Sequence, residues 1–211
     1  GEWREFDSYP PGPPAALRWT IGPGRRLATA GEPGTGRDSY RYDPADPTPN
    51  LGGAVFAFTG AGAVDNAPLE ARADVLTYTS PALVDDLTII GQCRATLHAR
   101  ARLPHVDFFV RLCDVGPDGI SLNICDGLLR VTPDTPADPD GHWRLDIPLH
   151  ATAHCFRKGH SLRLQIASGA HPRYARNPGT GEPIDTAVAM VPNDVEIVHA
   201  GTGITLPACR L

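Results

Sequence analysis

From Asp74 onward the chain is a succession of short runs in which apolar and polar residues alternate, and this pattern constrains the fold most strongly. A period of two is typical of strands that bury one face. Gly, Pro and Asp turns separate the runs at the spacing of an antiparallel sandwich or barrel. The predicted strands are Asp74–Ser80, Leu87–Ala101, Asp107–Val115, Ile120–Val131, Trp143–Ala151 and Ser161–Ser168.

The first 70 residues are dense in proline and glycine, as in "PPGPP" and "DPADPTP". Such density forbids long helices and restricts strands such as Ala16–Thr20 to sheet edges. No amphipathic helix of more than two turns is evident, and we interpret His150–Phe156 as a loop or single turn. The predicted class is therefore all-β and mostly antiparallel. Its 211 residues form one domain, in which long Pro/Gly-rich excursions (1–70) lead into the main sandwich (71–211).

The turn "GPDG" (116–119) sets the register of one predicted hairpin. A three-residue loop with Gly119 in the left-handed region pairs Leu112 with Ile124, and Phe108 with Leu128, on one core face. The same register places Cys113 and Cys125 on the other face as diagonal neighbours, about 7–8 Å apart and beyond disulfide reach. We therefore expect free thiols at both positions.

Composition excludes several classes of function. A formal net charge of −5 argues against a nucleic-acid partner. No apolar run is long enough to span a bilayer, and the N-terminal sequence lacks the features of a signal peptide, so no membrane partner is expected. The five cysteines are scattered without a C-x-x-C pair. They favour a reducing, cytoplasmic compartment.

The sequence contains no recognisable active-site motif and no cofactor-binding motif. The chain lacks G-x-S-x-G, and none of its eight histidines has a recognisable nucleophile placed with it. We expect them to be solvated or bonded to backbone. His154 and His160 could suggest a metal pair, but no third ligand is evident, so no metal is predicted. "DVGPDGISLNICDG" fails the calcium-loop pattern, and "GEPGTGR" and "NPGTGEP" lack the Walker spacing.

Several segments, in one order along the chain, resemble the C-terminal jelly-roll domain of the X-prolyl dipeptidyl-peptidase and cocaine-esterase family. They are "DVLTYTSPAL", "DFFVRLCDVGPDGISLNICDGLLR", "TAHCFRKGHSLRLQIAS" and "HPRYARNPGTGEP", preceded by "YRYDPADPTPNLGG" and "GAVDNAPLEARADVL". The resemblance implies a galactose-binding-like jelly-roll β-sandwich that packs against an α/β-hydrolase domain and its cap. It also implies that the Ser-His-Asp triad lies outside this chain, so that the chain alone is non-catalytic and its N-terminus is a start within a longer protein.

The resemblance further implies that the loop after "PTPNLGG" approaches the acyl pocket of the catalytic domain. The matching residues are Leu51, Gly52, Gly53 and Phe56. The alternative is an ordinary glycine turn with Phe56 in the core. We interpret the stretch Ser168–Pro183 as structural, with Arg173 and Tyr174 holding a surface excursion against the domain or against its catalytic partner.

Two other functions stay open. A carbohydrate- or ligand-binding module needs an exposed aromatic platform, for which only Trp3, Trp19 and Trp143 are available. An autonomous esterase is the other. A homo-oligomer is also possible, because a sandwich without its catalytic partner exposes an apolar patch.

Overall fold

The computed structural model describes residues 5–12, 15–29, 34–56 and 59–209. Almost every regular element in these ranges is a strand, and the two helices are single turns, too short to cross a membrane. The elements are β1 (Ala15–Gly22), η1 (Pro23–Arg25), β2 (Arg26–Thr29), β3 (Arg37–Tyr42), α1 (Ala67–Glu70), β4 (Leu76–Thr79), β5 (Leu87–Ala101), β6 (Val106–Val115), β7 (Ser121–Val131), β8 (Trp143–Phe156), β9 (Ser161–Ala167) and β10 (Asn193–Ala208).

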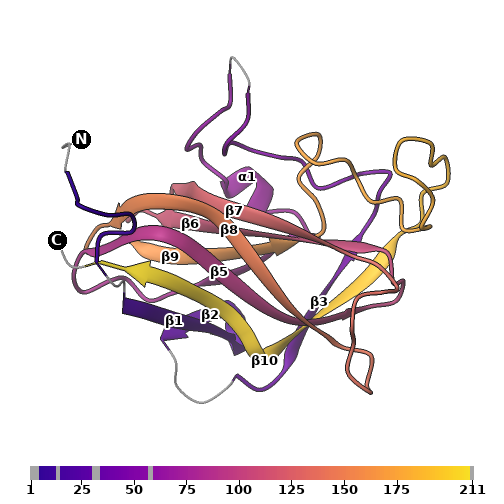
Figure 1. Cartoon of the computed structure of the whole chain (residues 1–211), viewed down its shortest axis with the longest axis horizontal. Coiled ribbons are helices and arrows are strands. Elements are labelled where there is room, and N and C mark those ends of the chain that lie inside the picture. Colours follow the sequence, from indigo (N-terminus) through magenta and orange to yellow (C-terminus); the bar gives the residue numbers. More distant parts are fainter. Residues whose placement is uncertain (1–4, 13–14, 30–33, 57–58, 210–211) are drawn as a thin grey trace.

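The strands form one ten-stranded sheet in the order β7-β6-β9-β4-β2-β1-β10-β5-β8, with β3 paired to β10. Among the described strands only β2 and β4 pair in parallel, through the single partners Arg26 and Thr79. The sheet curls so that its two halves face one another across a common core (Figure 1). Phe108 of β6, for example, meets Trp143 of β8 edge to face, with ring centroids 6.2 Å apart. The all-β, mostly antiparallel sandwich is confirmed.

The predicted strands correspond closely to β4–β9, and β1 contains the predicted strand Ala16–Thr20. Two expectations are wrong. β8 continues through His150 to Phe156, because residues 151–156 pair with residues 87–92 of β5. β1 is not an edge strand, since β2 pairs with one of its edges and β10 with the other.

The β6–β7 hairpin follows the predicted register only next to its turn. Cys113 pairs with Asn123 and Gly119 is left-handed (φ 85°), as predicted. A bulge then makes Ile124 an extra residue, so that Leu112 pairs with Cys125 and Phe108 with Leu129. The predicted pairs with Ile124 and Leu128 are therefore wrong. Cys125 faces the core while Cys113 lies on the other side of the sheet, and both are free thiols.

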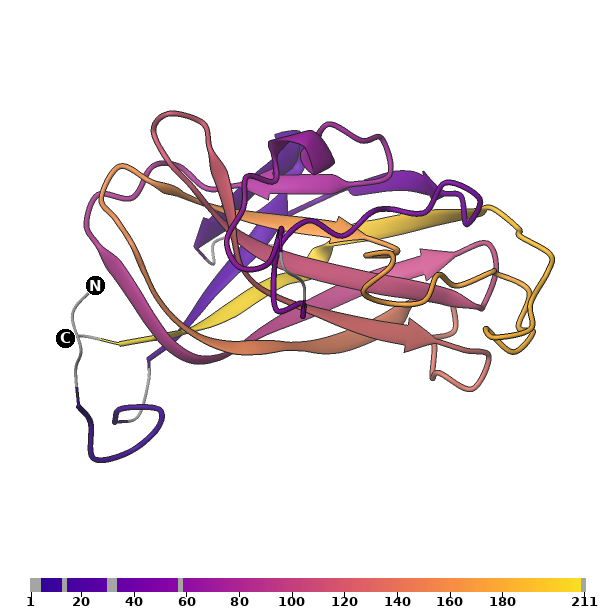
Figure 2. The same cartoon turned by 90° about the horizontal axis from the view of Figure 1, so that it is seen from above.

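Strand β6 is buried on both faces. Phe108, Val110 and Leu112 face the core. The opposite face carries Asp107, Phe109 and Arg111, which contact Asn177, Tyr174 and Leu51 respectively. The chain on either side of these contacts, residues 43–56 and 170–183, runs over this side of the sheet (Figures 1 and 2). Both Pro/Gly-rich excursions therefore end on the same side of the same strand, and this positions the candidate site.

Candidate functional site

The candidate site is the loop Asn50–Asn66, of which the structure describes residues 50–56 and 59–66; these lie beside α1 (Figure 1). Gly53 and Gly62 exchange two backbone hydrogen bonds, of 2.7 and 3.0 Å, and close the base of the loop. Asn123 of β7 accepts the Val64 N–H at 2.9 Å and donates to the Gly62 carbonyl at 3.0 Å. One asparagine side chain thus holds the returning arm of the loop on the sheet.

Arg111 anchors the outgoing arm from the middle of β6, where its side chain is fully buried. One guanidinium nitrogen donates to the Leu51 carbonyl at 2.6 Å and to Asn66 Oδ1 at 2.7 Å. The other donates to Asn50 Oδ1 at 3.1 Å and to Asp126 Oδ2 at 3.0 Å. A planar group with several fixed donors suits this role better than a lysine, because it binds four acceptors at once.

Asp126, only 3% exposed, lies between two guanidinium groups. Arg173 contributes the second, with its Nη1 2.8 Å from Asp126 Oδ1. The Arg173 guanidinium also lies over the ring of Tyr174, which in turn contacts Phe109. The stretch around Arg173 therefore binds the same buried carboxylate as the loop anchor, so both excursions share one support.

The paired glycines are required by this packing. Gly52 has φ 65°, and a Cβ there would lie 2.5 Å from Asn123 Oδ1. Gly53 has φ 83°, and a Cβ there would lie 2.9 Å from Arg173 Nη1. Only glycine combines a left-handed backbone with so close an approach to neighbouring polar groups.

The structure separates the four predicted residues into a base and a tip. Leu51 packs beside a small cluster of Leu69, Val75 and Ala167, while Gly52 and Gly53 form the turn. Phe56 is fully exposed, with a relative accessibility of 108%. The core alternative for Phe56 is therefore wrong. Beside the loop lies an open hollow of about 850 Å³, lined mainly by this loop together with Pro68, Pro172 and Arg173.

Arg173 and Tyr174 hold their excursion against the domain, as predicted, but the rest of the anchoring network was not predicted from the sequence. The sequence feature that could have indicated this network is Arg111, a charged residue between apolar neighbours in "FFVRLC". Such a strand is buried on both faces, and an arginine within it needs acceptors from elsewhere in the chain. The asparagines and Asp126 that supply them carry no pattern that would distinguish them from turn residues.

A second polar cluster involves His154 and His160, which donate to the two oxygens of Asp114 at 2.8 Å each. Burial acts to raise the pKa of Asp114, but these hydrogen bonds outweigh it and the pKa lies below its usual value of 3.8. The expectation that the histidines are solvated or bonded to backbone is wrong for this pair. Because the facing ring nitrogens already bind the carboxylate, the cluster is a hydrogen-bonded support of the β8–β9 turn.

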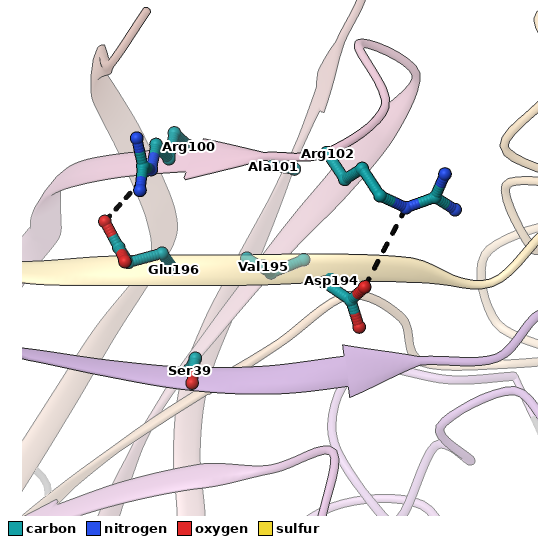
Figure 3. Close-up of a pocket in the computed structure, with 7 residues that line it drawn as sticks. All are labelled: Ser39, Arg100, Ala101, Arg102, Asp194, Val195 and Glu196. Carbon is teal, nitrogen blue, oxygen red and sulfur yellow. Dashed lines mark ion pairs between the residues drawn. The ribbon is translucent and has the colours of Figure 1, made fainter. Parts of the chain in front are cut away.

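A hollow of about 360 Å³ lies over the outer face of β3, β5 and β10. Its charged side chains are paired across the strands: Arg100 with Glu196 at 3.1 Å and Arg102 with Asp194 at 3.8 Å (Figure 3). Since each positive charge faces a carboxylate, a charged ligand would have to displace an ion pair. We therefore favour the loop Asn50–Asn66 as the functional site.

The fold and the anchored loop place the chain in the class of jelly-roll β-sandwich domains. Residues 1–198 match the family model of the X-Pro dipeptidyl-peptidase C-terminal non-catalytic domain. The chain is 32% identical to the cocaine esterase of Rhodococcus sp. (strain MB1 Bresler) over 197 residues, which cover 85% of the chain and 34% of that esterase. The chain belongs to the X-Pro dipeptidyl-peptidase C-terminal domain family, as the sequence predicted.

Solved structures show the same fold. An aminopeptidase from a marine sediment Thaumarchaeota archaeon superposes with a TM-score of 0.86 at 24% identity, over 99% of this chain and 39% of that one. An alpha-amino acid ester hydrolase gives a TM-score of 0.81 at 24% identity, over 92% and 36%. The chain therefore spans about a third of the length of these relatives.

Of the three tryptophans considered for a sugar platform, Trp19 and Trp143 are buried in the core. Trp3 lies outside the described residues. Neither of the two described tryptophans is therefore available as a platform for a sugar ring.

Proposed function

We propose that the chain is the accessory domain of a serine hydrolase, that it stabilises the α/β catalytic domain, and that its loop Asn50–Asn66 forms part of the wall of the acyl pocket. The names of its relatives describe hydrolysis of ester or peptide bonds. In such a reaction an acyl-serine forms and is hydrolysed with the help of an oxyanion hole. These groups belong to the catalytic domain, and the proposed contribution of this chain is to shape the wall of the acyl pocket.

The observation that carries the proposal is the position of Phe56. A phenylalanine buries a large apolar area when it finds a partner, and a fully exposed one leaves that contribution unused. Here the exposed ring stands on a loop whose base is fixed by Arg111, Asn123 and two glycines. A rigid base with an apolar tip is what a pocket wall requires, because little conformational entropy is lost when the tip meets its partner.

The proposal is tested by joining the chain to its catalytic half and comparing Phe56→Ala with wild type. We expect kcat/KM for an ester substrate to fall at least tenfold, with the free energy of unfolding changed by less than about 0.5 kcal/mol because the ring is exposed in the isolated domain. Val84→Ala is the matched control, since Val84 is an exposed apolar residue on a different loop. Unchanged kcat/KM in Phe56→Ala would contradict the proposal that this loop forms part of the acyl-pocket wall.

The stabilising role has a separate test. The catalytic half alone should unfold at a lower temperature than the joined protein, because association would bury exposed apolar side chains of this chain, such as Phe56, against it. Equal unfolding temperatures would contradict it. Association of the isolated chain with itself through the same surface is the corresponding expectation, and gel filtration measures it.

A cytoplasmic location is part of the proposal. The free thiols of Cys93, Cys113, Cys125 and Cys155 support it, because thiols persist in a reducing compartment.

A further inference from the structure

His98, Asp138 and His142 converge on the outer face of the sheet, away from the loop Asn50–Asn66. His98 lies on β5, and the other two belong to the connection between β7 and β8. One candidate ligand atom from each of them lies within 4.8 Å of the other two. All three residues are partly buried. Asp138 follows His98 by 40 residues and precedes His142 by four, so the cluster does not form a recognisable sequence motif.

The orientation of His98 is fixed by β10. That strand bulges between Val198 and Gly203, and the Ala200 carbonyl inside the bulge lies 3.1 Å from His98 Nδ1. Because a carbonyl only accepts, Nδ1 carries the proton and Nε2 of the neutral ring presents a lone pair. Nε2 is buried and has no hydrogen-bond partner among the described residues. A histidine held in this way by a backbone carbonyl is the usual arrangement of a metal ligand.

Asp138 presents one oxygen to His98 and uses the other to shape its own turn. Its Oδ1 accepts the backbone N–H groups of His142, at 2.8 Å, and of Asp140, at 3.1 Å. Its Oδ2 lies 3.8 Å from His98 Nε2, too far for a hydrogen bond. Two acceptors therefore face each other across a gap, an arrangement that a cation between them would stabilise.

His142 completes the cluster from the end of the connection, one residue before β8. Its Nδ1 lies 3.8 Å from Asp138 Oδ1, and its Nε2 lies 3.7 Å from Glu196 Oε1. Glu196 Oε1 is buried without a hydrogen-bond partner and faces Arg100 (Figure 3). With Nδ1 as the ligand atom, the Nε2 proton points to the Glu196 carboxylate, which is the carboxylate–histidine–metal arrangement.

We propose that His98, Asp138 and His142 bind a divalent transition-metal ion of the zinc class, with water in the fourth position. Two imidazoles and one carboxylate suit zinc in a tetrahedral site, whereas calcium and magnesium require more oxygen ligands. Ligand atoms about 2 Å from zinc are about 3.3 Å apart, so a separation of 3.8 Å between two of them needs only small side-chain rotations. The sequence analysis predicted no metal site, and the proposed site differs from that prediction.

The site differs from the second cluster of two histidines around one aspartate. In that cluster the ring nitrogens of His154 and His160 that face Asp114 already bind its carboxylate at 2.8 Å each. In the proposed site the corresponding distances are about 1 Å longer. A bound ion would join the β7–β8 connection to β5, and through Glu196 to β10. We infer a structural site that holds this connection on the sheet.

The test uses the metal-free chain without a histidine tag. Isothermal titration with ZnCl₂ should give one site of micromolar or tighter affinity, and CoCl₂ should give the intense visible absorption of a tetrahedral complex. Asp138→Asn and His98→Gln should each weaken zinc binding at least tenfold. His154→Ala is the matched control, because it removes a histidine from the other cluster, and its affinity should stay within twofold of wild type.

Circular dichroism establishes that each variant is folded before titration. Asp138→Asn retains a side-chain oxygen for the backbone N–H groups of its turn, so it tests binding even if His98→Gln fails to fold. Absence of zinc binding by wild type would overturn the proposal. So would binding that Asp138→Asn leaves intact, or that His154→Ala abolishes, since the ion would then occupy another site.

Discussion

Replacing Arg111 with methionine tests whether one buried guanidinium holds the loop Asn50–Asn66. The substitution keeps an unbranched side chain of similar length and removes the donors to Leu51, Asn66, Asn50 and Asp126. Breaking a buried ion pair costs about 3–5 kcal/mol. Arg173 still neutralises Asp126, which reduces this cost. Each acceptor left unsatisfied adds about 1–3 kcal/mol unless water reaches it.

We therefore expect Arg111→Met to lose about 4 kcal/mol of unfolding free energy, which for a chain of this size corresponds to a fall in Tm of about 8–16 °C. Urea unfolding followed by circular dichroism measures the loss, through the midpoint at constant m. Arg94→Met is the matched control: Arg94 also forms an ion pair, with Asp146 at 2.6 Å, but both side chains are about half exposed. The control should lose about 0–1 kcal/mol.

A loss in Arg111→Met no larger than in the control would refute the reasoning, because the guanidinium would then contribute no more than a surface charge. Limited proteolysis supplies a second measurement. The loop should be cleaved faster in Arg111→Met than in wild type, since its outgoing arm has lost its anchor. Equal rates would show that Asn123 and the glycine turn hold the loop without Arg111.

Three further predictions concern single residues. Gly52→Ala should lose at least about 1 kcal/mol more than Gly60→Ala in urea unfolding, because both glycines are left-handed but only Gly52 lacks room for a Cβ; equal losses would contradict this. Since the pKa of Asp114 is lowered in the folded state, its contribution to stability is present above about pH 4 and is lost as the pH falls through the folded pKa. The difference in unfolding free energy between wild type and Asp114→Asn should shrink on acidification, and growth would refute it. Burial raises the pKa of Cys113 to about 12. Iodoacetamide at pH 8 should therefore modify the partly exposed Cys155 and spare Cys113 in the native chain, as mass spectrometry would show.

Strands that bury one face could be predicted from the sequence because alternation records burial directly. The bounds of β5, Leu87–Ala101, agree with the prediction, and the turn at Gly119 fixed the nearby register. The bulge at Ile124 could not be predicted, because both registers place apolar residues on the core face and the choice depends on packing against other strands. β10 was missed because "NDVEIVHAGTGITLPA" contains three glycine and proline residues that indicate turns.

In the candidate site, too, only the features with a local sequence signal could be predicted. The family resemblance located Leu51, Gly52, Gly53 and Phe56, and the glycines could be interpreted locally as a turn. Arg111 lies 60 residues after Leu51, and Asp126 lies further still along the chain, so their role depends on which loop covers β6. Polar contacts between segments far apart in sequence leave no periodicity, so only the three-dimensional structure shows them.

Strand β10 also has a consequence for how the chain folds. One of its edges pairs with β3 and then with β1, where Ala15 meets Ala208, and its other edge pairs with β5 along most of its length. Three strands from earlier in the chain therefore complete their hydrogen bonding only when the last strand arrives. Pairing over such separations makes folding slow and leaves unpaired edges exposed in the meantime. During synthesis, the nascent chain would carry an open half-sheet until residues 193–208 had left the ribosome, and over that interval its unpaired strand edges would be exposed to aggregation.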